Sequence, residues 1–122
     1  MTLEEKLSFF VFVSLLIIIF VVSELPGYTT PEQIFGFTVD SAIKHFLLFG
    51  LLGLLCANWT RFYTKKLWIP IIFSVIYGVS DEIHQSFVPS RYTTVEDVIV
   101  NTIGCVVGVL VFSVIYKKFY SE

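Results

Sequence analysis

The stretch YGVSDEIHQSFVPSRYTTVEDVIVNTIGCVVG, residues 77–108, places a dense polar turn between two apolar segments. The first segment ends in Ser80-Asp81-Glu82-Ile83-His84-Gln85, and the second still carries Asn101 among apolar residues. In a lipid bilayer an ionisable group near the centre of a helix costs about 2.5–3.5 kcal/mol on insertion scales, so such groups face the protein interior and find partners. We therefore expect the functional site at this turn.

Apolar residues elsewhere in the 122-residue chain come in blocks and follow no amphipathic period; the blocks are residues 7–22, 43–57, 67–79 and 98–116. The chain is 56% hydrophobic and only 15% charged, which is outside the range of ordinary soluble proteins. Each block with its flanks reaches about 20 residues, the length that a helix needs to cross a bilayer core of about 30 Å. A soluble all-α protein would need polar helix faces that these blocks lack.

We therefore predict an all-α integral membrane bundle that forms a single domain over residues 1–122 and crosses the cytoplasmic membrane several times. The predicted transmembrane helices are, approximately, residues 6–24, 40–58, 67–87 and 95–116. The lipid bilayer is then the first partner of the chain.

Basic residues lie mainly on one side of this alternating topology; six of the eight are Lys6, Arg61, Lys65, Lys66, Lys117 and Lys118. The positive-inside rule then places both termini and the loop at residues 61–66 in the cytoplasm. The other side is mainly acidic, and only Lys44 and Arg91 oppose its carboxylates. Small juxtamembrane basic clusters suit anionic lipid head groups, and we expect no nucleic-acid partner.

The first apolar block has two interpretations. Thr2 and Glu5 have the spacing of a capping box, which starts a helix almost at the first residue. Lys6 before an apolar run also resembles a signal peptide, but the run is long and residues 21–23 offer no small-x-small cleavage site. We expect this helix to be retained. Cys56 and Cys105 fall inside predicted spans, so we expect them to pack in the core as free thiols.

The second helix begins near Asp40 and Lys44, which are four residues apart and able to pair on one helical face. The next residue, His45, has two interpretations. It either makes an ordinary hydrogen bond to a neighbour, or it faces the bundle and meets the acidic residues of the third helix.

The fourth helix has two capping alternatives, Thr93 with Glu96 or Thr94 with Asp97. One of the two acids then acts mainly as a cap. Four residues beyond Asp97, Asn101 begins a stripe that continues through two glycines, Gly104 and Gly108. Small residues at this spacing allow close helix packing in lipid, and we expect them to bring the polar end of the stripe into the bundle.

The motif Glu82-x-x-Gln85-x-Phe87-x-Pro89-x-Arg91, followed by Asp97, Asn101, Gly104 and Gly108 and preceded by His45-Phe46, resembles the VanZ-like family of small bacterial membrane proteins. The resemblance covers about residues 40–110. Ser90 stands where the family usually has glycine, and Lys44 directly precedes His45, whereas the family's lysine lies further upstream. The resemblance implies a role in the cell envelope, because the family is named after a protein that gives low-level resistance to teicoplanin. It implies no reaction.

We consider three functions for the candidate site residues, which are His45, Asp81, Glu82, Gln85, Arg91, Asp97 and Asn101. The favoured one is binding of a cell-wall precursor, an envelope lipid or a glycopeptide. The second is an enzyme that uses Glu82, His45 or Asp97 for acid–base chemistry. The third is a hydrogen-bonded clasp between helices. Known catalytic motifs are absent from the sequence, so whether the protein is an enzyme stays open.

The charge balance at this site predicts a cationic ligand. Five acids, including Asp40 and Glu96, face only Lys44 and Arg91, so carboxylates remain without a partner even after full internal pairing. Such groups either take up protons or bind a positive ligand. A divalent metal held by His45, Glu82 and Asp97 is only weakly indicated. We expect no bound metal and no cofactor.

Overall fold

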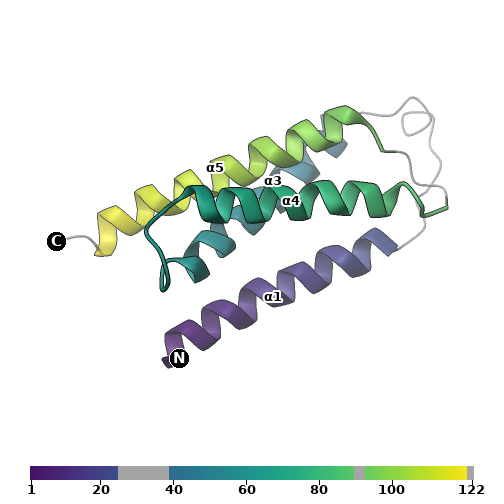
Figure 1. The fold of residues 1–122 in the computed structure, drawn as a ribbon. Coiled ribbons are helices and arrows are strands. Elements are labelled where there is room, and N and C mark those ends of the chain that lie inside the picture. The colour runs from purple at the N-terminus through teal and green to yellow at the C-terminus, as the bar shows by residue number, and fades with distance from the viewer. Residues whose placement is uncertain (25–38, 90–92, 121–122) are drawn as a thin grey trace.

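The computed structural model describes residues 1–24, 39–89 and 93–120. It contains the helices α1 (Leu3–Glu24), α3 (Val39–Thr60), α4 (Trp68–Gln85) and α5 (Val95–Tyr120). The first turn of α1, the last turn of α5 and the turn between α3 and α4 lie at one end of the bundle (Figure 1). No strand occurs in the described ranges, so the predicted all-α fold is confirmed.

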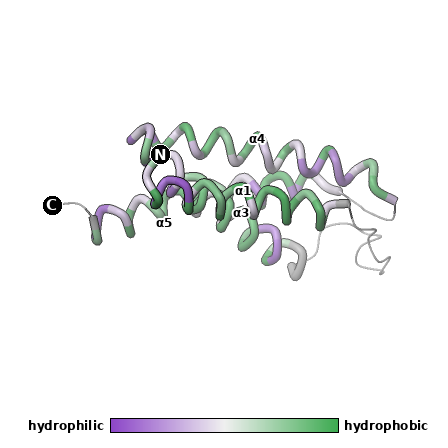
Figure 2. Tube along the Cα trace, turned by 90° about the horizontal axis from the view of Figure 1, so that it is seen from below, coloured by the Kyte–Doolittle hydropathy of each residue, from purple (hydrophilic) through white to green (hydrophobic). Residues whose placement is uncertain are grey.

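Three of these helices are long and apolar enough to cross a membrane, over Leu3–Ser23, Ala42–Thr60 and Val95–Phe119. The fourth, α4, has 18 residues and therefore a length of about 27 Å. Its last turn carries buried Asp81, Glu82 and Gln85, and the corresponding end of its trace is hydrophilic in Figure 2. These polar residues lower the hydropathy of α4, so its passage through the bilayer remains a prediction.

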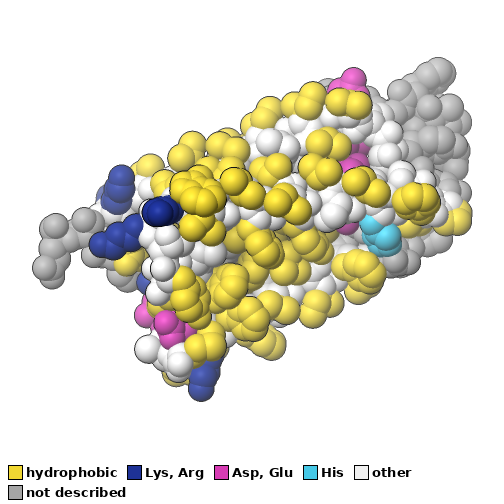
Figure 3. All heavy atoms as spheres, in the orientation of Figure 1, with side chains coloured by type: hydrophobic (Ala, Val, Ile, Leu, Met, Phe, Trp, Pro, Cys, Tyr) yellow, Lys and Arg dark blue, Asp and Glu magenta, His cyan; other side chains and the backbone are white. Residues whose placement is uncertain are grey.

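Large apolar side chains are exposed on all four described helices, and they cover most of the face that Figure 3 shows apart from its two ends. Examples are Phe10 on α1 (69% exposed), Leu47 on α3 (64%), Ile76 on α4 (63%) and Val114 on α5 (67%). In water so large an apolar surface would cause association, whereas lipid tails cover it without cost. The surface is therefore consistent with contact to a lipid bilayer.

The buried apolar core is built from residues of α1, α3 and α5, which are Phe12, Leu15, Ile19, Phe49, Leu52, Cys56 and Cys105. Both cysteines are free and fully buried, as predicted. The ring of Phe12 also stacks on Trp59 with centroids 5.4 Å apart, which fixes α1 against α3. The first helix is thus part of the same packed body.

Two pairs of glycines bring the backbones of α3 and α5 into contact. A Cβ atom at Gly104 would lie 2.8 Å from the carbonyl oxygen of Phe46, and one at Gly108 would overlap the carbonyl of Gly50. On the opposite helix, a Cβ at Gly53 would overlap the backbone of Cys105. Only hydrogen fits at these three positions. The stripe that the sequence predicts on the fourth helix therefore lies against α3.

The N-terminus of α1 is capped as the sequence predicts. The Thr2 amide donates to Glu5 Oε2 at 2.6 Å, and the Glu5 amide donates to Thr2 Oγ1 at 3.2 Å. These reciprocal bonds satisfy two amide groups that the first helical turn leaves without an intrahelical acceptor.

Candidate functional site

The neighbouring acids Asp81 and Glu82 lie at the end of α4 and contact different helices. Successive residues of an α-helix point about 100° apart, so one side chain reaches α1 while the next reaches α3 and α5. Both are buried, with 6% and 4% of their surface exposed. The sequence predicts a single site for both acids, but the structure divides them between two groups of side chains.

The first group joins α4 to α1, and we call it the α1–α4 clasp: Ser23, Tyr77, Asp81 and Gln85. The Ser23 hydroxyl donates to Asp81 Oδ1 in a short hydrogen bond. Gln85 Nε2 donates to Asp81 Oδ2 at 2.9 Å, and the Tyr77 hydroxyl donates to the carbonyl oxygen of Leu16 at 2.6 Å. Both carboxylate oxygens of Asp81 therefore have donors inside the protein.

The second group, which we call the polar cluster, consists of His45, Glu82 and Asn101, which contact one another, and of Asp97, which lies one turn before Asn101 on α5. His45 Nδ1 lies 2.7 Å from Asn101 Oδ1, and Asn101 Nδ2 donates to Glu82 Oε1 at 3.0 Å. His45 Nδ1 also lies 3.4 Å from Glu82 Oε1, within ion-pair distance when the imidazole is protonated. His45 thus faces the bundle, and Asn101, which is 1% exposed, links α3 to α4.

Asp97 lies one turn before Asn101 on α5 and caps that helix. Its Oδ2 accepts a hydrogen bond from the Thr94 amide at 3.2 Å, and its own amide donates to Thr94 Oγ1 at 3.3 Å. Of the two capping alternatives, the structure thus has Thr94 with Asp97. Glu96, the acid of the other alternative, is exposed. Only one oxygen of Asp97 serves the cap, so its other carboxylate oxygen is available to a second partner.

Two oxygens of the polar cluster are buried without a hydrogen-bond partner among the described residues. They are Glu82 Oε2 and Asp97 Oδ1. More than nine-tenths of buried polar groups in proteins have a partner, so an unpartnered carboxylate oxygen needs an explanation. The exposed fractions of the two residues are 4% and 6%, so bulk water does not supply the missing donors.

Other predicted site residues do not join the polar cluster. Gln85 belongs to the α1–α4 clasp with Asp81. Arg91 and Ser90 lie outside the described residues, as does the side chain of Asp40. His84, one turn from Ser80, stacks on Phe20 of α1 with ring centroids 5.0 Å apart. The structure therefore brings His45, Glu82 and Asn101 of the predicted set into contact, with Asp97 one turn before Asn101 on α5.

Sequence reasoning missed Ser23 as a partner of Asp81. A single serine at the end of an apolar block has no spacing signal that distinguishes it from a residue at a helix end. A partial signal existed in the stripe of Tyr77, Asp81 and Gln85, which predicts one polar face on α4 but does not say which helix covers it.

The polar cluster contains a carboxylate and an imidazole in contact, which is one component of acid–base catalysis. Among the side chains that the structure describes, no hydroxyl or thiol hydrogen-bonds to His45. The described part of the chain also contains no group of three His, Cys, Asp or Glu residues placed to hold a metal. His45, Glu82 and Asp97, the weakly indicated metal alternative, are thus not placed as such a group in the described part of the chain.

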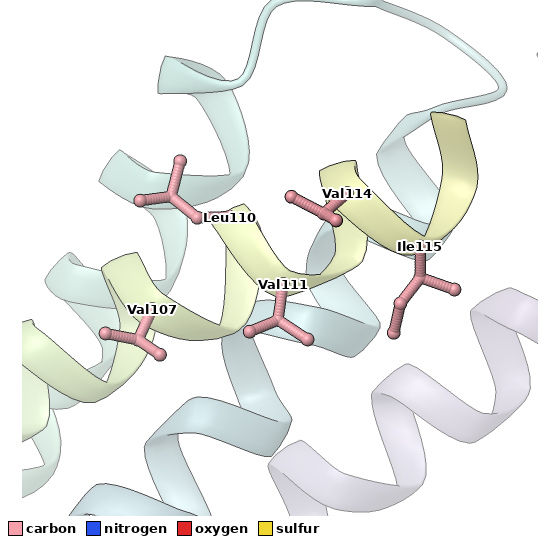
Figure 4. A pocket seen from close by; sticks show the side chains of 5 residues that line it. All are labelled: Val107, Leu110, Val111, Val114 and Ile115. Carbon is pink, nitrogen blue, oxygen red and sulfur yellow. The ribbon is translucent and has the colours of Figure 1, made fainter. Parts of the chain in front are cut away.

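A hollow of about 310 Å³ lies on the outer face of α5, beyond the polar cluster toward the C-terminus (Figure 4). Its lining is entirely aliphatic: Val107, Leu110, Val111, Val114 and Ile115. No polar group enters it, so it suits a lipid chain and not the ligand chemistry of the polar cluster.

Comparison with known families decides the membership of this chain. The family model VanZ/LLP1 matches residues 7–116, nearly the whole chain. The chain belongs to the VanZ/LLP1 family. No curated protein and no solved structure matches it. The VanZ/LLP1 match extends the sequence resemblance of residues 40–110 to include α1, in agreement with the packing of that helix against α3 and α4.

Proposed function

We propose that this VanZ/LLP1 protein is a multi-pass protein of the bacterial cytoplasmic membrane that binds an envelope ligand in the polar cluster. The supporting observation is the contact of His45, Glu82 and Asn101 from three helices inside an apolar bundle, together with two unpartnered carboxylate oxygens. A motif that only packs helices gains nothing from unpartnered acceptors, because each buried acceptor without a donor lowers the stability of the folded protein by about 1–3 kcal/mol. Donors on a ligand would remove that cost.

The charge distribution supports a site on the outer side of the membrane. Lysine and arginine side chains gather at the bundle end that holds the start of α1 and the end of α5 (Figure 3). The polar cluster lies toward the opposite end, where α4 ends and α5 begins. The positive-inside rule places the basic end in the cytoplasm, so the polar cluster faces outward.

An outward site gives access to cell-wall precursors, envelope lipids and glycopeptides. A protein that holds a wall-linked or lipid-linked group at the membrane surface changes how much of that group is available to an antibiotic that binds it. This gives the protein a route to teicoplanin resistance without any reaction. The His45–Glu82 pair supports a second candidate, acid–base chemistry on the bound ligand, for which a changed ligand mass after incubation is the test.

Thermal unfolding of the purified protein in detergent tests ligand binding. The wild type is heated with a lipid-linked wall precursor, an envelope lipid or teicoplanin, because a ligand that binds only the folded protein raises Tm by mass action. At least one of them is expected to raise Tm in the wild type, and Glu82→Gln is expected to lose that rise. Glu96→Gln, which changes an exposed carboxylate in the first turn of α5, is expected to keep the rise in Tm. If none of the ligands changes Tm in the wild type, the proposed function is wrong.

A further inference from the structure

The unpartnered oxygens also indicate what the ligand presents, if the polar cluster is the binding site proposed above. We propose that the polar cluster recognises a primary ammonium group held between Glu82 Oε2 and Asp97 Oδ1.

The two oxygens require hydrogen-bond donors. Each belongs to a carboxylate that the protein holds in place through its other oxygen, since Asn101 binds Glu82 Oε1 and the Thr94 amide binds Asp97 Oδ2. The two carboxylates come from different helices, α4 and α5, and their residues are 4% and 6% exposed. Acceptors fixed in this way lose little entropy when a donor binds.

The charge of the polar cluster favours a cation over a neutral donor. Neither Glu82 nor Asp97 forms a salt bridge with a lysine or arginine of the described residues. Asn101 and the Thr94 amide are neutral donors, and His45 reaches only the Oε1 side of Glu82. A positive ligand group thus supplies both the missing donors and the missing charge, and charge-assisted hydrogen bonds are the stronger kind.

The arrangement distinguishes an ammonium from other cations. Mg²⁺ and Ca²⁺ take six or more oxygen ligands, whereas the polar cluster offers one open oxygen on each of two carboxylates. A guanidinium prefers both oxygens of one carboxylate, and on each acid one oxygen is engaged. A quaternary ammonium has no N–H donor and needs an aromatic cage. An ammonium has three N–H donors, so single oxygens on two residues suit it.

Two sources present such a group at the outer membrane surface: an amine-bearing lipid head group and the free amine of a wall peptide. His45, whose side chain is one-fifth exposed, is the most exposed member of the polar cluster, so the ligand would enter from its side. Both sources share the primary ammonium, and the experiment below separates them.

The test measures the Tm of the purified protein in detergent micelles with pairs of probes that differ only at nitrogen. Phosphatidylethanolamine is compared with phosphatidylcholine, and glycylglycine amide with its N-acetyl form. We expect a rise in Tm with the primary amine of one pair and none with its trimethylated or acetylated counterpart.

The affinity for the amine is expected to fall about tenfold or more in Glu82→Gln and in Asp97→Asn, since each variant loses a charge-assisted bond. Asparagine keeps a side-chain oxygen for the α5 cap, so Asp97→Asn remains informative if Glu82→Gln does not fold. Glu96→Gln keeps the wild-type affinity.

Other results overturn the proposal. The two oxygens would have another partner if phosphatidylcholine raised Tm as much as phosphatidylethanolamine, or if Mg²⁺ or Ca²⁺ raised it more than either amine. The same would follow if the amines bound only after Arg91→Gln. If teicoplanin or a wall precursor stabilises the wild type but not Glu82→Gln, and N-acetylation of the ligand makes no difference, the ammonium is wrong while the proposed function stands. If no ligand of any kind raises Tm, both are wrong.

Discussion

Asn101 is the residue on which the polar cluster depends most. Its amide faces His45 through the oxygen and Glu82 through the nitrogen, so one fully buried side chain satisfies groups on two other helices. Replacing a buried partner leaves the remaining groups to bear their desolvation penalty, which is about 1–3 kcal/mol. Most of the effect of substitution should therefore come from Glu82 and His45, which stay behind without their partner.

We predict that Asn101→Ala lowers the free energy of unfolding by about 1–3 kcal/mol. Thr102→Ala is the matched control, because the Thr102 hydroxyl donates only to the carbonyl oxygen of Val98 on its own helix. Denaturant or thermal unfolding in the same detergent measures both variants. An equal loss for the two would mean that the bonds of Asn101 to α3 and α4 contribute little.

Among the elements, α3 and α5 form the closest pair, and their glycines are not equivalent. A Cβ at Gly108 overlaps the backbone carbonyl of Gly50, which is unable to move away without shifting the helix. A Cβ at Gly50 itself meets its nearest atom, the carbonyl oxygen of Gly104, at 3.5 Å, an ordinary contact distance. The same substitution is therefore expected to have opposite effects at the two positions.

We predict that Gly108→Ala destabilises the bundle by about 1–3 kcal/mol through overpacking. Gly50→Ala should be neutral, or stabilise by up to about 1 kcal/mol, because alanine is the better helix former. Unfolding of both variants in detergent gives the comparison. A stable Gly108→Ala protein, or a damaging Gly50→Ala, would contradict the close approach of α3 and α5.

Sequence patterns predict the helices well, because apolar blocks of about 20 residues have few other stable forms in lipid. The capping box of Thr2 and Glu5 and the glycine stripe were also visible as local spacings. No local spacing in the sequence shows that Asp81 and Glu82 belong to different groups of side chains. Which helix covers each face of α4 depends on the packing of the whole bundle, and the partner of Asp81 is a single serine 58 residues away. The choice between Thr93 and Thr94 as cap was likewise open, since both spacings are equally good.

The whole molecule has a basic end and an end where the polar cluster lies, and this polarity makes a prediction about topology. We predict that a cysteine in place of Ser90 reacts with an impermeant thiol reagent on intact cells, whereas one in place of Lys65 reacts only after the cells are opened. The native protein is the blank, because Cys56 and Cys105 are fully buried. Labelling at position 65 but not at 90 would invert the topology and place the polar cluster inside the cell.

Two neighbouring residues of α4 allow the central claim to be tested on the intact protein. The structure gives Asp81 to the α1–α4 clasp and Glu82 to the polar cluster, so their conservative amide variants should fail in different ways. The decisive measurement is the ligand-induced rise in Tm, compared between Asp81→Asn and Glu82→Gln with whichever envelope ligand stabilises the wild type. We predict that Asp81→Asn starts from a lower Tm yet keeps the rise, whereas Glu82→Gln loses it. A rise of the same size in both variants, or its loss in both, would contradict a binding site at Glu82 that is separate from the clasp.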